Sequence, residues 1–259
     1  MIVEPKREIL LGPLLRAGLQ RSWAARDHFL RLAVIPLAVM LSILVPLQRA
    51  VVEMMADAQA NRIPEDGGPM PRVALLVLVY GAALSVFAVN WIRQLTLGAS
   101  AAPNLGLSLR TRHLRFFVLV MATSFGSSIL AVILALVLSV FGGPGTWAAL
   151  MAGTLIWGAM IVRISPSWIG TAIDAPMPLR IAWRRTAGQG FKLLIAVLAV
   201  QVPLMMFDRL IGSVFMMGGW LTAVPMTYLL ISSTIQLIGV AVQIAILVTA
   251  FPHFLRETV

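Results

Sequence analysis

Charged residues are absent from six long stretches of this chain, and this partition constrains the fold more than any other feature. The uncharged stretches are Leu32–Leu47, Val73–Ile92, Phe116–Phe141, Trp147–Val162, Leu193–Phe207 and Met226–Phe251. A helix needs roughly 20 apolar residues to cross a hydrocarbon layer of about 30 Å. Barrel strands would alternate polar and apolar residues, and runs such as residues 73–80 do not alternate. The sequence therefore predicts an all-α, polytopic membrane protein.

The composition supports this class, because 59% of the 259 residues are hydrophobic and only 12% are charged. Globular chains carry about 25% charged residues, so a soluble fold would lack the polar surface to cover its core. We expect one membrane domain over residues 1–259. Its six spans are expected at about 29–47, 73–92, 116–141, 147–165, 191–207 and 226–251, with amphipathic surface helices at about 8–28 and 178–188.

The segments between the spans carry further expectations. In the first surface helix, Leu11, Leu14, Leu15 and Gly18 share one face, which predicts a helix lying on the membrane surface. Residues 97–115 resemble a third, weaker surface helix, which suggests three hairpin units. Whether these units are a true internal repeat, or arise independently from selection for positive charge on one side, is left open. After a predicted turn at Asp208–Arg209, residues 210–222 are apolar, and whether they re-enter the membrane is left open.

Basic residues gather on one side of the predicted topology. The N-terminus, the segments 93–115 and 163–192 and the C-terminus together hold 16 of the 20 Lys and Arg residues, against 4 on the opposite side. Positive charge is retained on the cytoplasmic side of a membrane, so both termini are predicted to be cytoplasmic. The net charge of +10 then follows from topology, and nucleic-acid binding is not needed to explain it.

One segment carries a family resemblance. An Arg-x-Ser ends the fourth span, a short turn holds an acidic residue, and Ala-Trp-Arg-x-Thr-x-Gly leads into the fifth span. These elements fall on Arg163, Ser165, Asp174, Ala182, Trp183, Arg184, Thr186 and Gly188. The pattern resembles uncharacterised six-span bacterial inner-membrane proteins, which are similar to the membrane domain of some glycerophosphodiester phosphodiesterases. The resemblance implies this fold and a bacterial inner-membrane location, with the catalytic domain absent and no activity assigned.

Catalytic chemistry has little support in the sequence. The chain has no Cys, and His28, His113 and His253 are scattered at predicted membrane boundaries. Metal sites need convergent ligands, so interfacial anchoring is the favoured interpretation of the histidines. No serine in a span has a His or Lys base inside the predicted bilayer core. We therefore expect a non-enzymatic protein without cofactor or metal.

Four amides lie inside the predicted spans: Asn90, Gln201, Gln236 and Gln243. Hydrogen bonding between helices, at about 0.6–2 kcal/mol each, is the default interpretation. The alternative function, a transporter or channel for an amphipathic or lipid-like solute, requires all four to converge on one cavity. No ionisable group lies near the predicted midplane, which disfavours ion-coupled transport.

Basic side chains next to the predicted inner leaflet are the most suggestive feature. They are Arg110, Arg112, Arg115, Arg180, Arg184, Arg185 and Lys192. Each basic residue near an anionic membrane surface contributes about 1 kcal/mol. The leading hypothesis is a membrane protein that contacts anionic lipids through these residues or supports a membrane complex. A protein partner or a homo-oligomer is left open.

Overall fold

The computed structural model describes residues 9–59, 68–101, 110–139, 143–218 and 225–255, and all regular structure in these residues is helical. The eight α-helices described are α1 (Leu11–Ala24), α2 (Arg26–Gln59), α3 (Met70–Leu97), α4 (Thr111–Ser139), α5 (Gly143–Ala172), α6 (Leu179–Arg185), α7 (Gly190–Met217) and α9 (Pro225–Leu255). A short 3-10 helix, η1, covers Ala99–Ala101. The predicted all-α class is confirmed for this part of the chain.

Six of the helices are long, from 28 residues in α3 and α7 to 34 in α2. Four segments are long and apolar enough to cross a membrane by length and composition: Arg26–Leu47, Met70–Leu97, Gly190–Met217 and Met226–Leu255. The membrane character predicted from the sequence is thus confirmed at four helices. The helices α4 and α5 cover the other two expected spans with 29 and 30 residues. The count of six spans and the three-hairpin repeat stay predictions.

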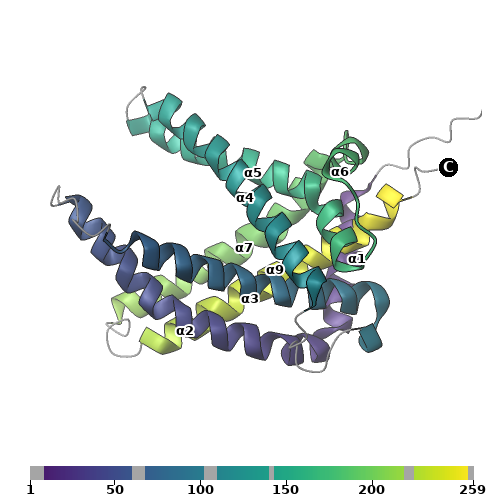
Figure 1. Ribbon diagram of the computed structural model, residues 1–259, viewed down its shortest axis with the longest axis horizontal. Helices are drawn as coiled ribbons and strands as arrows, with labels where there is room; N and C mark the ends of the chain where they lie inside the picture. The colour runs from purple at the N-terminus through teal and green to yellow at the C-terminus, as the bar shows by residue number, and fades with distance from the viewer. Residues whose placement is uncertain (1–8, 60–67, 102–109, 140–142, 219–224, 256–259) are drawn as a thin grey trace, which may run out of the picture.

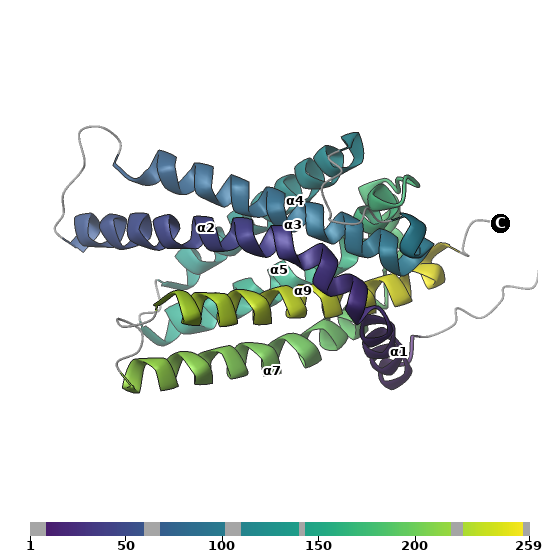
Figure 2. The ribbon, with the colours of Figure 1, turned by 90° about the horizontal axis from the view of Figure 1, so that it is seen from below.

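The short helices lie together at one end of the molecule. Figures 1 and 2 show α1, α6 and the C-terminal end of α9 on the right, while α2 and α7 end on the left. The helices α3, α5 and α9 all finish at the right-hand end, and α2, α4 and α7 begin there. We call it the arginine end, for reasons given below, and the opposite end the far end. The segments with most basic residues therefore share one end.

Two predicted connections turn out to be largely helical. The helix α2 continues past the expected boundary at residue 47 to Gln59, and α3 begins at Met70, inside the expected loop 48–72. The turn predicted at Asp208–Arg209 is wrong, because α7 runs through both residues to Met217. Asp and Arg lower the hydrophobicity of a segment, but their helix propensities are ordinary and they leave the backbone ladder intact. Residues 219–222 lie outside the described residues.

The third surface helix, predicted over 97–115, is also wrong in its described parts. The helix α3 runs on to Leu97, and η1 follows after Gly98. Thr111 already begins α4, so Arg112 and Arg115 lie on the first turns of the long helix itself. Residues 102–109 lie outside the described residues. These arginines therefore extend a long helix and do not belong to a separate one.

The larger core cluster lies towards the arginine end. It combines the last turns of α3, the first turns of α4 and the end of α5 with α2 and α9. Trp91 is fully buried at its centre, stacks on Phe87 with ring centroids 6.2 Å apart, and meets Phe29 edge-on at 5.7 Å. The Trp91 Nε1–H donates to Ala241 O at 2.9 Å, which satisfies its only polar atom. This contact ties α3 to α9.

The first surface helix packs on the bundle. Its predicted apolar face is confirmed in part, since Leu14 and Gly18 are buried, and α1 contacts α9 and α7. A Cβ added at Gly18 would lie 2.7 Å from Ile246 Cγ1 and 3.0 Å from Ile246 Cα. Because backbone at this distance cannot move aside easily, glycine is required where α1 crosses α9. The opposite face leaves Leu19 and Trp23 exposed.

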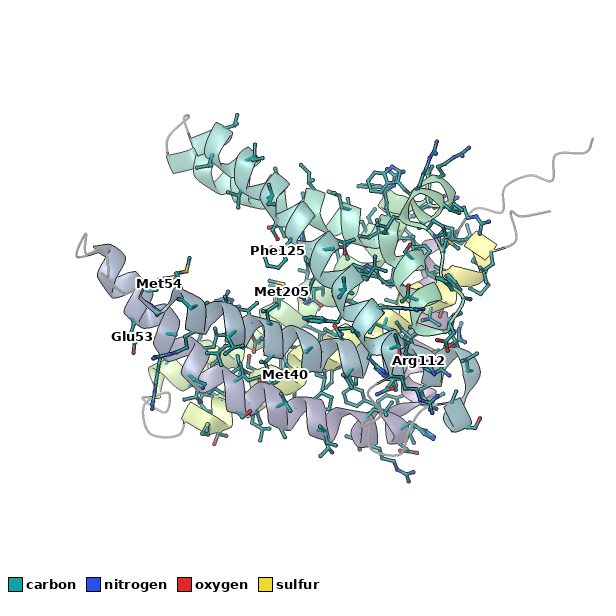
Figure 3. The ribbon with its side chains drawn as sticks, in the orientation of Figure 1. Met40, Glu53, Met54, Arg112, Phe125 and Met205 are labelled. Carbon is teal, nitrogen blue, oxygen red and sulfur yellow. The ribbon has the colours of Figure 1, made fainter. Side chains whose placement is uncertain are left out.

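The hairpin of α4 and α5 diverges from the other helices. Figure 1 shows it rising away from α2 and α3 towards the upper left, and Figure 3 labels Phe125 on this hairpin. Apolar side chains of α4 are exposed along most of its length: Leu114, Val118, Phe125, Ile129, Val132, Ile133, Leu136 and Val137. Surfaces of this size on soluble proteins mark interaction sites. Here they are consistent with helices that face lipid.

Candidate functional site

Arginines at the arginine end bind the carbonyl groups that the helices leave unpaired there. Arg21 donates to Leu95 O at 2.6 Å in the last turn of α3, and Arg185 donates to Phe254 O at 2.8 Å at the end of α9. Arg93 donates to Ala172 O at 3.2 Å, the last residue of α5. The final carbonyls of a helix have no partner within it and carry partial negative charge. Each of the three helices that end here thus receives a guanidinium.

The end of α5 places one carboxylate among these arginines. Asp174 has φ +63°, the left-handed conformation that usually belongs to glycine after a helix. Ala175 N–H then donates back to Gly170 O at 2.9 Å. The return is tight, because a Cβ at Gly170 would lie 2.5 Å from Ala175 O. Aspartate tolerates this conformation better than most residues, and here it brings a charged side chain to the turn.

Two arginines share the carboxylate of Asp174. Arg93 on α3 donates from Nη1 to Asp174 Oδ2 at 3.0 Å, and Arg112 on α4 donates from Nη1 to the same oxygen. The Arg93 and Arg112 side chains are only 15% and 14% exposed, whereas Asp174 is 53% exposed. Arg93 also donates from Nε to Ala101 O at 3.2 Å. This cluster joins α3, η1, α4 and the α5–α6 turn; Figure 3 labels Arg112.

His113 fixes the start of α4 beside the cluster. Its Nδ1 accepts the Arg110 N–H at 3.0 Å, and its Nε2 lies 3.3 Å from Asn90 Oδ1 on α3. A ring that accepts at Nδ1 and donates at Nε2 is neutral. Burial lowers the pKa of His113, which lies outside the expected span, and the charges of Arg112, Arg93 and Arg110 lower this pKa further. His113 therefore acts here as a neutral link between helices.

The residues of the sequence motif meet where α5, α6 and α7 join. Thr186 is fully buried and donates to Arg163 O at 3.1 Å and Ala182 O at 2.9 Å. The Arg163 guanidinium lies 3.7 Å from the Trp183 ring centroid and donates to Trp183 O at 3.0 Å. The buried Ser165 hydroxyl donates to Val162 O. These contacts hold α6 against α5.

Two other motif residues occupy turns, while the eighth is at the surface. Gly188 has φ +79° in the turn before α7, and Asp174 ends α5 as described above. Arg184 is exposed on α6. The structure thus gives a packing or turn role to most of the motif.

The seven basic residues predicted as lipid contacts divide into groups. Arg110, Arg115, Arg180 and Arg184 are exposed. Arg112 and Arg185 are instead engaged with Asp174 and Phe254 O, and Lys192 is half-buried. Arg21 and Arg93 were missed by sequence reasoning, because they read as ordinary boundary charges. Their partners lie 74 and 79 residues away, so no local pattern identifies them.

The four intramembrane amides do not meet at one place. Gln243 Nε2 donates to Gln201 Oε1, which joins α9 to α7. Tyr80 donates to Gln236 Oε1 at 3.3 Å between α3 and α9, and Asn90 contacts His113 between α3 and α4. Such pairs are typical of hydrogen bonding between membrane helices. The convergence that the transporter alternative requires is not present in these contacts.

Comparison with family models, with curated proteins and with solved structures finds no match to this chain. The resemblance to six-span bacterial proteins therefore stays a prediction from the motif between Arg163 and Gly188.

Proposed function

We propose that this chain is a non-enzymatic integral membrane protein with six spans, whose arginine end binds anionic lipid headgroups. The arginine end lies at the cytoplasmic leaflet of a bacterial inner membrane in this proposal. The charge distribution supports that orientation, because the segments that the sequence assigns to the cytoplasmic side hold 16 of the 20 basic residues. The lengths of α4 and α5 support the count of six.

The observation that carries the proposal is the surface of α6. Its buried face is narrow, formed by Ala182 and the following Thr186. The exposed surface alternates between basic and apolar side chains: Leu179, Arg180, Ile181, Trp183 and Arg184. A helix that offers arginine together with exposed leucine, isoleucine and tryptophan fits the boundary between headgroups and acyl chains. A water-facing surface would leave the exposed parts of Leu179 and Ile181 in water, whereas acyl chains would cover them.

Retained lipid tests the proposal. The double variant Arg180→Gln/Arg184→Gln removes two exposed charges and leaves Arg185 to cap α9. Each charge contributes about 1 kcal/mol, so the apparent affinity for phosphatidylglycerol should fall on the order of 10- to 30-fold. Mass spectrometry of the detergent-purified protein measures phosphatidylglycerol retained per protein chain.

The matched control is a double variant that removes the same number of charges at the far end. Arg72→Gln/Arg209→Gln also removes two exposed arginines. We expect this variant to retain phosphatidylglycerol as the unaltered protein does. Equal retention by all three proteins contradicts lipid binding at α6.

The orientation has a separate test, because the chain contains no Cys. Single cysteines at Asn61 and Asn104 report the two sides of the predicted topology. With an impermeant maleimide on intact cells, Asn61→Cys is expected to react and Asn104→Cys to stay unlabelled. The opposite pattern places the arginine end outside.

A further inference from the structure

The cluster at Asp174 has more positive charge than its single carboxylate balances. Arg93 and Arg112 both bind Asp174, and Arg110 and Arg115 flank them on the first turns of α4. Within the described residues, Asp174 is the one acidic side chain that pairs with these arginines. The potential in this region is therefore positive, and the site favours a further anion.

The two guanidiniums also have donors to spare. A guanidinium has five N–H groups in a planar fork. Arg112 makes its hydrogen bond through Nη1, and Arg93 makes its bonds through Nε and Nη1, in the part of the chain that the structure describes. The remaining nitrogens of Arg112 and Arg93 are not among the buried atoms without a partner there. The Arg93 and Arg112 side chains are 15% and 14% exposed, so the cluster is open to solvent at its edge.

Asp174 uses this donor set poorly. Both arginines bind the same oxygen, Oδ2, and the side chain is 53% exposed. A guanidinium bonds most strongly to a carboxylate or phosphate through two parallel hydrogen bonds. An anion with three or more oxygens could satisfy both forks at once, which a carboxylate held on one oxygen does not.

We propose that Arg93 and Arg112 form a phosphate-binding site in which Asp174 is the resident counter-ion that the incoming phosphate displaces. The site deepens the proposed function, because it names phosphate as the recognised group of the lipid. To that extent the site proposal rests on the proposed function. The Asp174 carboxylate moves into solvent when phosphate binds. The carbonyl bonds of Arg93 to Ala101 and Ala172 stay in place and hold its guanidinium in position.

The phosphate has two sources, a lipid headgroup or a free phosphate ion. Exposed Leu114 and Val118 follow Arg112 along α4, so a phospholipid bound here has apolar surface for its acyl chains. Inorganic phosphate would use the arginines alone. Dihexanoyl phosphatidic acid and inorganic phosphate, titrated separately at constant ionic strength, distinguish the two sources.

The decisive variant is Asp174→Asn. Asparagine tolerates a positive φ as aspartate does, so the turn is kept while the competing charge is removed. We expect the midpoint of phosphate-induced thermal stabilisation to fall about tenfold, which corresponds to about 1.4 kcal/mol. Asp27→Asn is the control, because it makes the same charge change at an exposed residue beside Arg26. The proposal is overturned if Asp174→Asn needs as much phosphate as Asp27→Asn, or more, for half of the thermal stabilisation.

Loss of the arginine gives the complementary result. Arg112→Gln is expected to weaken binding at least tenfold, whereas Arg72→Gln, which removes an exposed arginine at the far end, stays within about threefold of the unaltered protein. If Arg112→Gln does not fold, Arg112→Lys keeps the charge without the fork and is expected to bind severalfold more weakly. Equal binding by Arg112→Lys and the unaltered protein overturns a fork-based site. The Arg180→Gln/Arg184→Gln variant leaves this site intact, so failure of the α6 proposal and failure of this one are separate results.

Discussion

The two ends of the helix bundle use arginine in different ways. At the arginine end, Arg21, Arg93 and Arg185 bind carbonyls at the ends of α3, α5 and α9. At the far end, Arg72 approaches Glu53 only to 3.9 Å, and both side chains are more than half exposed. Three long helices finish at each end of the bundle, so helix direction does not explain the difference. The explanation is the supply of arginine, because the described basic side chains gather at the arginine end and reach the terminal carbonyls there. The basic residues that the sequence predicts to orient the chain in a membrane therefore include residues that cap helices.

Side-chain packing also differs between the arginine end and the diverging α4–α5 hairpin. The buried aromatic cluster around Trp91 lies towards the arginine end, while Phe125 on the diverging α4–α5 hairpin is 60% exposed. Stability should thus be concentrated where α2, α3 and α9 meet. The outer part of the hairpin should contribute little.

The largest expected difference between the regions comes from truncating one aromatic in each. Trp91→Ala removes a buried ring and leaves Ala241 O without its donor, so it should cost about 3–5 kcal/mol. Phe125→Ala should change stability by about 0.5 kcal/mol or less, as for exposed positions generally. Thermal unfolding in detergent measures both. Comparable losses for the two variants would show that the hairpin packs as tightly as the core.

Adding volume at glycine sharpens the same contrast. Gly18→Leu forces α1 away from Ile246 and should cost about 1–3 kcal/mol, the range for overpacked cores. Gly126→Leu on α4 meets nothing within 4 Å, and leucine has a higher helix propensity by about 0.8 kcal/mol, so no loss is expected. Melting temperatures of the two variants give the comparison. If Gly18→Leu is as stable as the unaltered protein, the close crossing of α1 and α9 is contradicted.

Helix capping gives a smaller effect that still separates the ends. Arg185→Gln removes the guanidinium at the end of α9 and should cost about 1 kcal/mol, within the range of charges at helix termini. Arg209→Gln removes an exposed arginine within α7, away from the last turn of the helix, and should leave the melting temperature unchanged. Equal shifts would mean that the carbonyl contact of Arg185 adds nothing.

The smallest expected effect is a loss of folding stability at acid pH, caused by protonation of His113 at the arginine end. Because the pKa of His113 lies below 6.5 in the folded protein, the unfolded chain binds a proton first as the pH falls. Stability from this group is complete above pH 6.5 and is lost as the pH falls below that value. Protonation of Nδ1 also breaks its bond to Arg110 N–H. His113→Gln should flatten the decline in melting temperature between about pH 7.5 and 5, and parallel declines would contradict this role.

Sequence reasoning predicted the long helices because hydrocarbon imposes a length and an absence of charge. It failed where the outcome depends on partners far away in the chain. Asp208 and Arg209 suggested a turn, yet α7 passes through them. The surface helix expected at about 178–188 is present as α6, but the sequence did not indicate which residues pack: the small Ala182 and Thr186 are buried.

The candidate site was predicted in composition but not in arrangement. The basic residues near Arg112 and the acidic turn residue Asp174 were each noticed, but they lie 62 residues apart and no spacing rule joins them. The left-handed conformation of Asp174 was also hidden, because a glycine normally signals it. Tertiary contacts decide which arginines stay exposed and which bind protein groups.

The crossing of α1 over α9 has a consequence for how the chain assembles. Gly18 and Ile246 are more than 200 residues apart in the sequence, and a ribosome adds about 5–20 residues per second. The first helix must therefore wait on the order of 10 to 50 seconds for its final partner. During that interval α2 and α7, which also contact α1, can meet it, so the packing of the first helix is completed by the last one to be translated.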